Sequence, residues 1–178
     1  PKDNFTISDT TTYSNNQPVN TYHGPELRIS SRYSLTRQSS LKISYNKTRQ
    51  YIHMLSNTVA VSPTSTWKLS DPNVLPQLAD QISAGLYRDV EIHGSRLETS
   101  VEAYYKWMQN VIDYKIGSQL TLNKNIEMDI LQGKAKAYGA EFLIRKPKGK
   151  LNGWISYTYS RTLLQLESDF PSEQINNG

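Results

Sequence analysis

The chain has 178 residues, of which 37% are hydrophobic, and its 12 tyrosines far outnumber its 3 phenylalanines; the mean hydropathy is -0.62. The 20 basic residues are scattered among 16 acidic ones, so the net charge of +4 does not indicate a nucleic-acid-binding segment. The absence of cysteine excludes disulfides and thiolate metal sites, and no stretch approaches the ~18 apolar residues of a membrane-spanning helix.

The first two strands are predicted at residues 27–35 and 41–49. Odd positions from Leu27 to Leu35 are mostly apolar, whereas the even positions hold only Arg and Ser. The second run places Leu41, Ile43 and Tyr45 between polar residues. Successive side chains of a strand point to opposite faces of the sheet. We therefore expect a hairpin with one apolar and one polar face.

A long loop is predicted at residues 50–79 from its prolines and its many Ser, Thr, Asn and Asp residues. A short strand follows at 81–87, and turn-like residues follow that strand. The clearest alternation runs over 96–107, where Leu97, Val101 and Trp107 share one face with other apolar residues. A second long loop is predicted at 108–132.

The last predicted hairpin joins strands at residues 135–146 and 151–162 through the turn at 146–149, where Pro147 and Gly149 suit a tight connection. Short and long connections therefore alternate along six strands. This alternation puts every short turn at one end of the sheet, as in bacterial outer-membrane barrels. Most of the strands have the ~9–11 residues that a tilted strand needs to cross a bilayer.

A soluble antiparallel sandwich would explain the alternation equally well, but it would not explain the one-sided loop lengths. Six strands are also fewer than the eight of the smallest barrels, and an open sheet cannot sit in lipid with unpaired edges. No signal peptide is visible at the start of the sequence. We therefore expect a mature or internal piece of a longer barrel protein.

Six segments carry a family resemblance: Gln-Tyr-Ile-His-Met-Leu-Ser-Asn at 50–57, Glu-Ala-Tyr-Tyr-Lys at 102–106, its continuation Asn-Val-Ile-Asp-Tyr-Lys at 110–115, Ala-Tyr-Gly-Ala-Glu at 137–141, Gly-Trp-Ile-Ser-Tyr-Thr-Tyr-Ser-Arg at 153–161 and Ile-Asn-Asn-Gly at 175–178. Together, and in this order, they resemble the barrel of TonB-dependent receptors of Bacteroidetes-type bacteria. The resemblance extends over residues 27–163.

The resemblance implies an all-β chain, an antiparallel meander of about six strands that forms an incomplete segment of a large transmembrane β-barrel. Residues 1–178 would be a partial barrel domain without a plug domain, a TonB box or an aromatic-ended closing strand. The family imports nutrients across the Gram-negative outer membrane, with energy delivered by the TonB complex. We therefore expect a fragment that cannot transport alone and whose substrate is unknown.

The partners implied by the resemblance are outer-membrane lipid, the missing plug and barrel strands of the parent chain and, through the parent, the TonB complex. The isolated fragment is expected to oligomerise through its open edges. A self-contained soluble β-domain that binds a partner or carbohydrate at the cell surface is the alternative. No motif supports an enzyme, and a hydrolase is a remote third reading.

No catalytic, cofactor-binding or metal site is predicted, and the substrate-binding residues are unknown. The three histidines lie in separate segments without metal-ligand spacing: His23, His53 and His93. Glu98 and Glu102 share a strand face but are separated by roughly 13 Å, too far for a glycosidase pair. Asp113 and Asp129 lack calcium-loop spacing.

The alternation also assigns side chains to the two faces of the predicted barrel wall. The residues expected to face lipid are Leu27, Ile29, Val101, Ala103, Phe142, Ile144, Ile155 and Tyr157. The residues expected to face the lumen are Arg28, Glu98, Glu102 and Glu141. Trp67 and Trp107 are expected either to contact ligand from loops or to lie in an interfacial aromatic belt, and the belt is preferred for Trp107. Trp154 is expected on the polar side.

Overall fold

The protein is described from a computed structural model, which covers residues 14–18, 20–55, 66–92, 94–114, 129–166 and 174–177. The main sheet is antiparallel and contains, in spatial order, β1 (Arg28–Ser34), β2 (Ser39–Gln50), β5 (Gln77–Ile92), β6 (Ser95–Tyr114), β7 (Ile130–Lys146), β8 (Gly153–Leu166) and β9 (Gln174–Asn177). A separate two-stranded sheet pairs β3 (Ile52–Leu55) with β4 (Thr66–Leu69).

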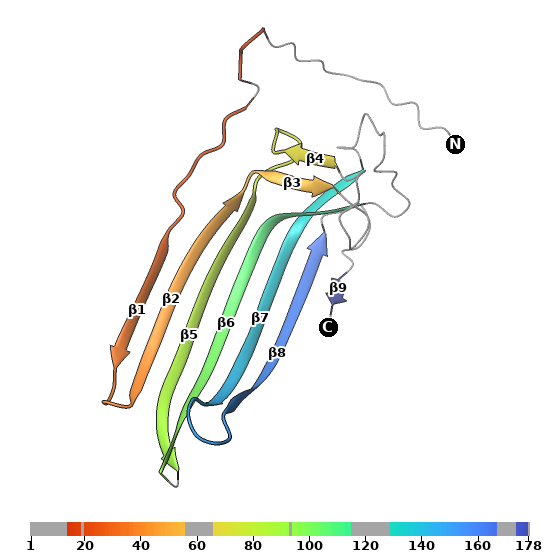
Figure 1. Ribbon diagram of the computed structural model, residues 1–178. Coiled ribbons are helices and arrows are strands. Elements are labelled where there is room, and N and C mark those ends of the chain that lie inside the picture. Colours follow the sequence, from red (N-terminus) through yellow and green to blue (C-terminus); the bar gives the residue numbers. More distant parts are fainter. Residues whose placement is uncertain are drawn as a thin grey trace.

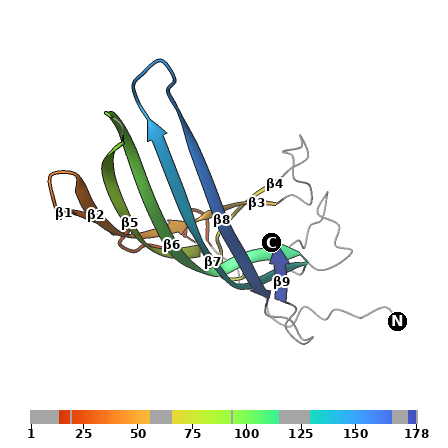
Figure 2. The ribbon, with the colours of Figure 1, turned by 90° about the horizontal axis from the view of Figure 1, so that it is seen from below.

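The long strands lie side by side, and the short connections gather at one end of the sheet (Figure 1). These connections join β1 to β2, β5 to β6 and β7 to β8. The β3–β4 hairpin lies at the opposite end, called here the loop end, and a second view shows the same arrangement (Figure 2). Among the described residues, no helix is long and apolar enough to cross a membrane.

Several strands extend beyond their predicted bounds. The strand predicted at 81–87 is β5, which spans Gln77–Ile92, and the strand predicted at 96–107 is β6, which continues to Tyr114. The turn-like residues expected after 87 are therefore mostly strand. The extra residues are polar or mixed, and hydrogen bonding to both neighbouring strands keeps them extended even without clear alternation.

The two predicted long loops are wrong where they overlap these extensions. The loop predicted at 50–79 contains β3, β4 and the start of β5, and the loop predicted at 108–132 contains the end of β6 and the start of β7. The short strand β9, which pairs with β8, was not predicted. Strands of four residues are too short for period-two alternation to distinguish them from loop.

The cross-strand register aligns apolar side chains in rows across the sheet. One row crosses six strands and consists of Tyr33, Leu41, Leu86, Val101, Phe142 and Tyr157. We call the surface formed by this row and its parallel rows the apolar face. The residues predicted to face lipid all lie on it: Leu27, Ile29, Val101, Ala103, Phe142, Ile144, Ile155 and Tyr157.

The opposite surface, the polar face, has a matching row of Arg32, Lys42, Gly85, Glu102, Glu141 and Thr158. The residues predicted to face the lumen lie on this surface: Arg28, Glu98, Glu102 and Glu141. Some of its side chains are small and little exposed, as at Ser40 (4%) on β2 and Ser100 (8%) on β6. The large apolar side chains therefore lie on the apolar face, where they are more exposed to solvent than these small side chains of the polar face.

Little apolar surface is buried within the described part of the chain. The buried hydrophobic residues are Leu55, Val74, Ala79, Ala135 and Ala137. The three alanines come from the sheet, whereas Leu55 belongs to the β3–β4 hairpin and packs against Ile112, Tyr114 and Ile130. The main sheet is therefore held by its backbone ladder and cross-strand contacts rather than by a second layer.

Two backbone features shape β6 and β7. Asn110 adopts a positive φ of 56° beside a register shift between Gln109 and Val111, and its side-chain amide donates to the Pro76 carbonyl at 2.8 Å. Asn tolerates this conformation better than most residues, and a bulge bends its strand. On β7, Gly139 lies opposite Tyr104, so the Tyr104 ring occupies the space that a side chain would fill.

Replacing Gly139 with alanine should destabilise the sheet. The added Cβ would lie 2.6 Å from the Tyr159 carbonyl oxygen and 2.9 Å from the Tyr104 ring, and the backbone oxygen cannot easily move. We expect Gly139→Ala to cost about 1–3 kcal/mol, as overpacking does, measured as a lower urea midpoint by tryptophan fluorescence. Ala140→Ser, on the next residue but the opposite face, is the control. Equal midpoints for both variants would contradict this account.

Candidate functional site

The polar face carries a connected group of side chains around Gly85. Because Gly85 has no side chain, the Tyr87 ring lies over it, within 3.1 Å of where a Cβ would be. The Tyr87 hydroxyl and the Glu102 Cγ also approach this position, at 3.2 Å and 3.0 Å. On the other side, the Arg32 Nε donates to the Ser40 Oγ at 3.0 Å. The group presents a guanidinium, a phenol and a carboxylate on one surface.

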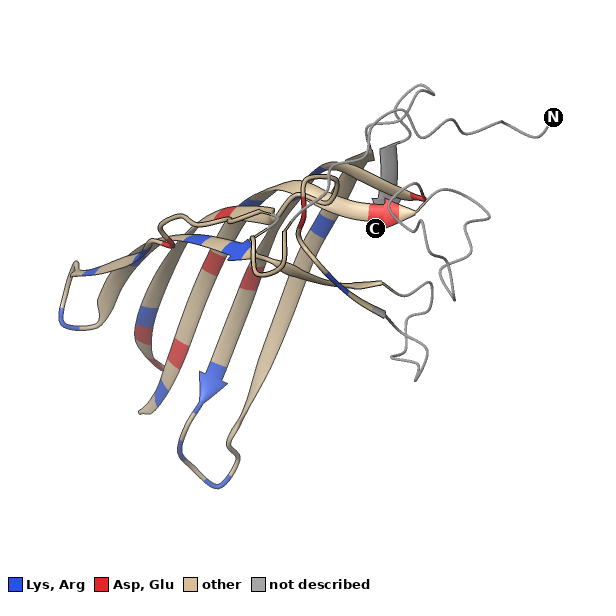
Figure 3. Cartoon of the chain, turned by 90° about the horizontal axis from the view of Figure 1, so that it is seen from above, with Lys and Arg blue, Asp and Glu red and all other residues tan. Residues whose placement is uncertain are grey.

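Two carboxylates also meet across the strands of this face. Glu102 and Glu141 are register partners on β6 and β7, and both are exposed. Directly opposed residues have Cβ atoms about 4.5–5.5 Å apart, and like charges at that distance repel. Acidic and basic positions recur along several strands of the sheet (Figure 3). This surface is suited to water or polar partners and not to lipid.

The apolar face ends in aromatic and charged residues toward the loop end. Tyr105 stacks on Tyr138 with centroids 6.3 Å apart, and it contacts Trp107 at 5.9 Å. On β2 and β5, the Tyr45 hydroxyl donates to the Asp80 carboxylate, and Lys47 lies 3.7 Å from the same oxygen. Aromatic residues with polar tips followed by charges are typical of a boundary between apolar and aqueous surroundings.

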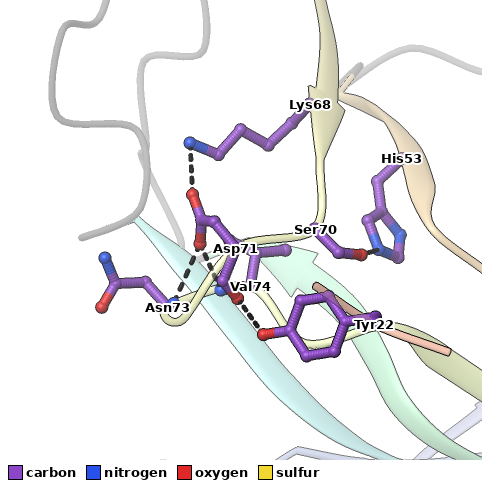
Figure 4. A network of polar contacts seen from close by, with 7 residues as sticks. All are labelled: Tyr22, His53, Lys68, Ser70, Asp71, Asn73 and Val74. Carbon is purple, nitrogen blue, oxygen red and sulfur yellow. Dashed lines mark hydrogen bonds and ion pairs between the residues drawn. The ribbon is translucent and has the colours of Figure 1, made fainter. Parts of the chain in front are cut away.

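At the loop end, Asp71 organises the chain between β4 and β5 (Figure 4). Its carboxylate accepts hydrogen bonds from the backbone N–H groups of Asn73 and Val74 and pairs with Lys68 at 2.7 Å. The Tyr22 hydroxyl donates to the Asp71 carbonyl at 2.7 Å. Burial acts to raise the pKa of Asp71, but Lys68 and the two N–H donors outweigh it, so the pKa lies below its usual value.

His53 is buried beneath this cap. Its side chain is 2% exposed, and Nε2 lies 3.3 Å from the Ser70 hydroxyl (Figure 4). Burial lowers the pKa of the imidazole because the charged form is more costly to desolvate. A buried neutral His with a hydroxyl partner is a structural residue of the hairpin.

Within the described ranges, the titratable residues considered in the sequence analysis do not come together in a catalytic or metal site. The described residues contain no group of three or more His, Asp or Glu side chains that could hold a metal ion. His23 lies in the segment before β1 and His53 in β3, while His93 is outside the described residues. Glu98 pairs with Arg145 at 3.7 Å, so it belongs to the wall of the polar face.

The remaining candidates also have local roles. The Asp113 carboxylate accepts from the backbone N–H of Tyr114 at 2.8 Å, and Asp129 lies in the turn before β7. Trp107 is 36% exposed at the loop end of the apolar face, whereas Trp154 lies on the polar face opposite Arg145. Trp67 lies on β4 and is 61% exposed.

Sequence reasoning missed the residues that depend on the pairing of β5. The group around Gly85 and the Tyr45–Asp80 bond become visible once β5 is aligned with β2 and β6. One signal in the sequence could have extended β5. The period-two alternation continues through Leu78, Asp80 and Ile82, and it places Asp80 on the apolar face. The Asp71 cap was marked by an Asp-Pro-Asn run, which favours a turn.

Comparison with known proteins adds one finding. A family model described as "TonB dependent receptor-like, beta-barrel" matches residues 3–178. No curated protein and no solved structure matches the chain.

Acidification should loosen the β3–β4 hairpin through His53. Because its pKa is lowered in the folded state, the stabilisation is fully present above the unfolded value of 6.5 and is lost as pH falls below it. We expect hydrogen exchange at the Ser70 amide, which bonds to the Tyr51 carbonyl, to accelerate between about pH 7 and pH 5, after correction for intrinsic exchange. His53→Gln should remove this step, and the Val101 amide should show none. An equal step in the variant would exclude His53 as its source.

Proposed function

Because the chain belongs to the family of TonB-dependent receptor-like β-barrels, we propose that it forms part of the wall of an outer-membrane receptor that takes up nutrients. In this proposal the apolar face contacts lipid and the polar face lines the lumen. The wall segment is not competent for transport alone. The parent protein would lie in the outer membrane of a Gram-negative bacterium.

The observation that supports this proposal best is the band of exposed apolar side chains in register. Along β6 the band extends from Leu97 to Trp107. At ~3.3 Å per residue this is about 33 Å of strand, or about 25 Å of height at a tilt near 40°, which matches the apolar belt of outer-membrane barrels. Members such as Ile43, Ile82 and Phe142 are 46–49% exposed. Water would disfavour such a surface, whereas lipid would cover it.

The polar face fits a lumen wall. It carries Arg32, Lys42, Glu102 and Glu141 in a single row. Transfer of these charged side chains into the hydrocarbon core of a bilayer would have a large unfavourable free energy. Its smaller, less exposed side chains fit the inner side of a curved sheet. A plug domain supplied by the parent would face this wall.

The open edges require further strands. The described sheet ends at β1 on one side and β9 on the other, and each edge strand has one neighbour. Unpaired N–H and C=O groups cannot remain in a lipid environment, so a membrane barrel must close. We infer that strands outside this sheet complete the ring, and that the parent would couple to the TonB complex through its plug. The imported substrate is set by surfaces outside the described wall.

A soluble β-domain that binds a partner at the cell surface is the competing function. It would need to bury the apolar face, but the described residues provide no second layer over that face. Such a domain would be monodisperse and cooperatively folded without detergent. The barrel segment should instead require detergent or lipid and should oligomerise through its edges in water.

A charge placed on the apolar face should block barrel assembly. Val101 lies near the middle of the band, where an Arg costs about 2–4 kcal/mol. We expect Val101→Arg in the parent protein to reduce the assembled fraction sharply, measured in outer-membrane extracts by the mobility of unheated samples on denaturing gels. Glu102→Gln, the next residue on the polar face, is the matched control and should assemble normally.

Either of two outcomes would contradict the assignment of the faces. Equal assembly of Val101→Arg and Glu102→Gln would show that Val101 does not meet lipid. A defect confined to Glu102→Gln would show that assembly depends on the Glu102 charge and not on the apolar surface at Val101. Recovery of the unmodified parent as a soluble monomer would overturn the membrane function itself.

A further inference from the structure

A small pocket lies on the polar face where the β1–β2 turn, residues 35–38, meets β5, at the end of the sheet that carries the short connections (Figure 1). We call it the turn pocket. Its volume is about 100 Å³, a space for a few water molecules or one small ion rather than for a sugar or a peptide. The lining side chains that decide its chemistry are Arg32, Arg37, Ser40, Tyr87 and Asp89.

A buried hydroxyl orients the Arg32 guanidinium in this pocket. The Arg32 Nε donates to the Ser40 Oγ at 3.0 Å, and Ser40 is almost fully buried. This bond uses the Nε donor alone, and no other hydrogen bond or ion pair joins the Arg32 side chain to a described residue. The two terminal nitrogens are therefore available to an oxyanion, which guanidinium groups bind through paired N–H donors.

Cations gather around the turn pocket without matching acids. Arg32 is the register partner of Lys42, so two positive side chains lie directly opposite each other on the polar face. Arg37, in the adjoining turn, also lines the pocket. Among the described residues, none of these three cations pairs with an acidic side chain. Like charges that face each other across a ladder repel, so an anion between them would stabilise this corner of the sheet.

The acidic side chains around the pocket do not balance this charge. Asp89 lines the pocket, but its carboxylate pairs with Arg96 at 2.5 Å. Glu102 shares a cross-strand row with Lys42 and Arg32, yet it lies two strands from the first and three from the second. At ~4.8 Å per strand these separations are about 10 Å and 14 Å. The cations of the turn pocket therefore await an anion from outside the described sheet.

We propose that the turn pocket binds a single oxyanion, either a carboxylate or a phosphate group. Such a group accepts N–H donors from Arg32 and Arg37 and lies close to the Lys42 ammonium. Its source is a free anion or an acidic side chain of the parent protein outside the described sheet. The inference goes beyond the proposed function and does not depend on which face meets lipid, because every group that it uses lies on the polar face or in the β1–β2 turn.

The test measures hydrogen exchange at the β1–β2 turn of the parent protein in detergent. The Leu35 and Thr36 amides are reporters because both donate to the Ser39 carbonyl. The Asp89 amide is a third reporter because it donates to the Gln38 carbonyl and so ties the turn to β5. Sodium phosphate and sodium acetate are titrated separately, with chloride keeping the ionic strength constant. We expect at least one of these anions to slow exchange about tenfold when present at about ten times its Kd.

Removing either guanidinium of the pocket should weaken this effect. We expect Arg32→Gln and Arg37→Gln each to raise the Kd of the anion about tenfold or more, because each variant loses charge-assisted hydrogen bonds. Arg28→Gln is the matched control and should leave the Kd unchanged. Arg28 lies on the same strand and face as Arg32, but its guanidinium pairs with Glu26 at 3.9 Å.

Two results with free anions would overturn the inference. An equal effect of added chloride would show that the anions act only by screening charge. Equal slowing by phosphate or acetate in Arg32→Gln, Arg37→Gln and Arg28→Gln would place the bound anion elsewhere on the protein.

If neither anion slows exchange in the unmodified protein, Arg37→Gln decides the matter. Arg37 makes no hydrogen bond or ion pair with a described residue through its side chain, so its loss removes no described contact of the turn. Faster exchange in this variant would show that the pocket already holds a carboxylate of the parent protein. Unchanged exchange would overturn the inference. None of these results bears on barrel assembly, which the comparison of Val101→Arg with Glu102→Gln tests separately.

Discussion

A single shared register across the antiparallel sheet determines what each surface of this protein can contact. Since side chains alternate between faces with a period of two, a slip by one residue would exchange the faces of a whole strand. The row from Tyr33 to Tyr157 remains aligned through five consecutive strand pairings. That alignment turns six separate amphipathic strands into one apolar and one polar surface. The aromatic group and the group around Gly85 both depend on it.

The register also explains how a chain of low hydropathy can suit a membrane. A spanning helix must be apolar on all sides, whereas a barrel strand needs apolar groups at every second position only. The other half of the residues can be Ser, Arg, Lys and Glu, as on the polar face. Tyrosine contributes to both surfaces, since its ring packs against apolar groups and its hydroxyl reaches polar ones, as Tyr105 and Tyr87 illustrate. A mean hydropathy of -0.62 is thus compatible with lipid contact.

The sequence predicted those features that depend on alternation within one strand. The presence of six strands and the assignment of residues such as Val101 and Glu102 to opposite faces follow from period two, and the turn at 146–149 follows from Pro147 and Gly149. Features that depend on pairing between strands could not be predicted in the same way. The extension of β5 to Gln77 relies on hydrogen bonds to β2 and β6, and the contact between Tyr105 and Tyr138 relies on the offset between β6 and β7. The β3–β4 hairpin depends on burial of Leu55 by residues far along the chain.

The loop end differs from the sheet in how its apolar and polar groups are accommodated. In the sheet, large apolar side chains remain exposed, and the described residues do not cover them. Around Asp71, by contrast, the chain satisfies its own polar groups: Lys68, two backbone N–H donors and the Tyr22 hydroxyl all converge there, and Val74 is fully buried. Such a cap can hold its shape in water. In the proposed receptor, the wall would contact lipid and this loop structure would contact water.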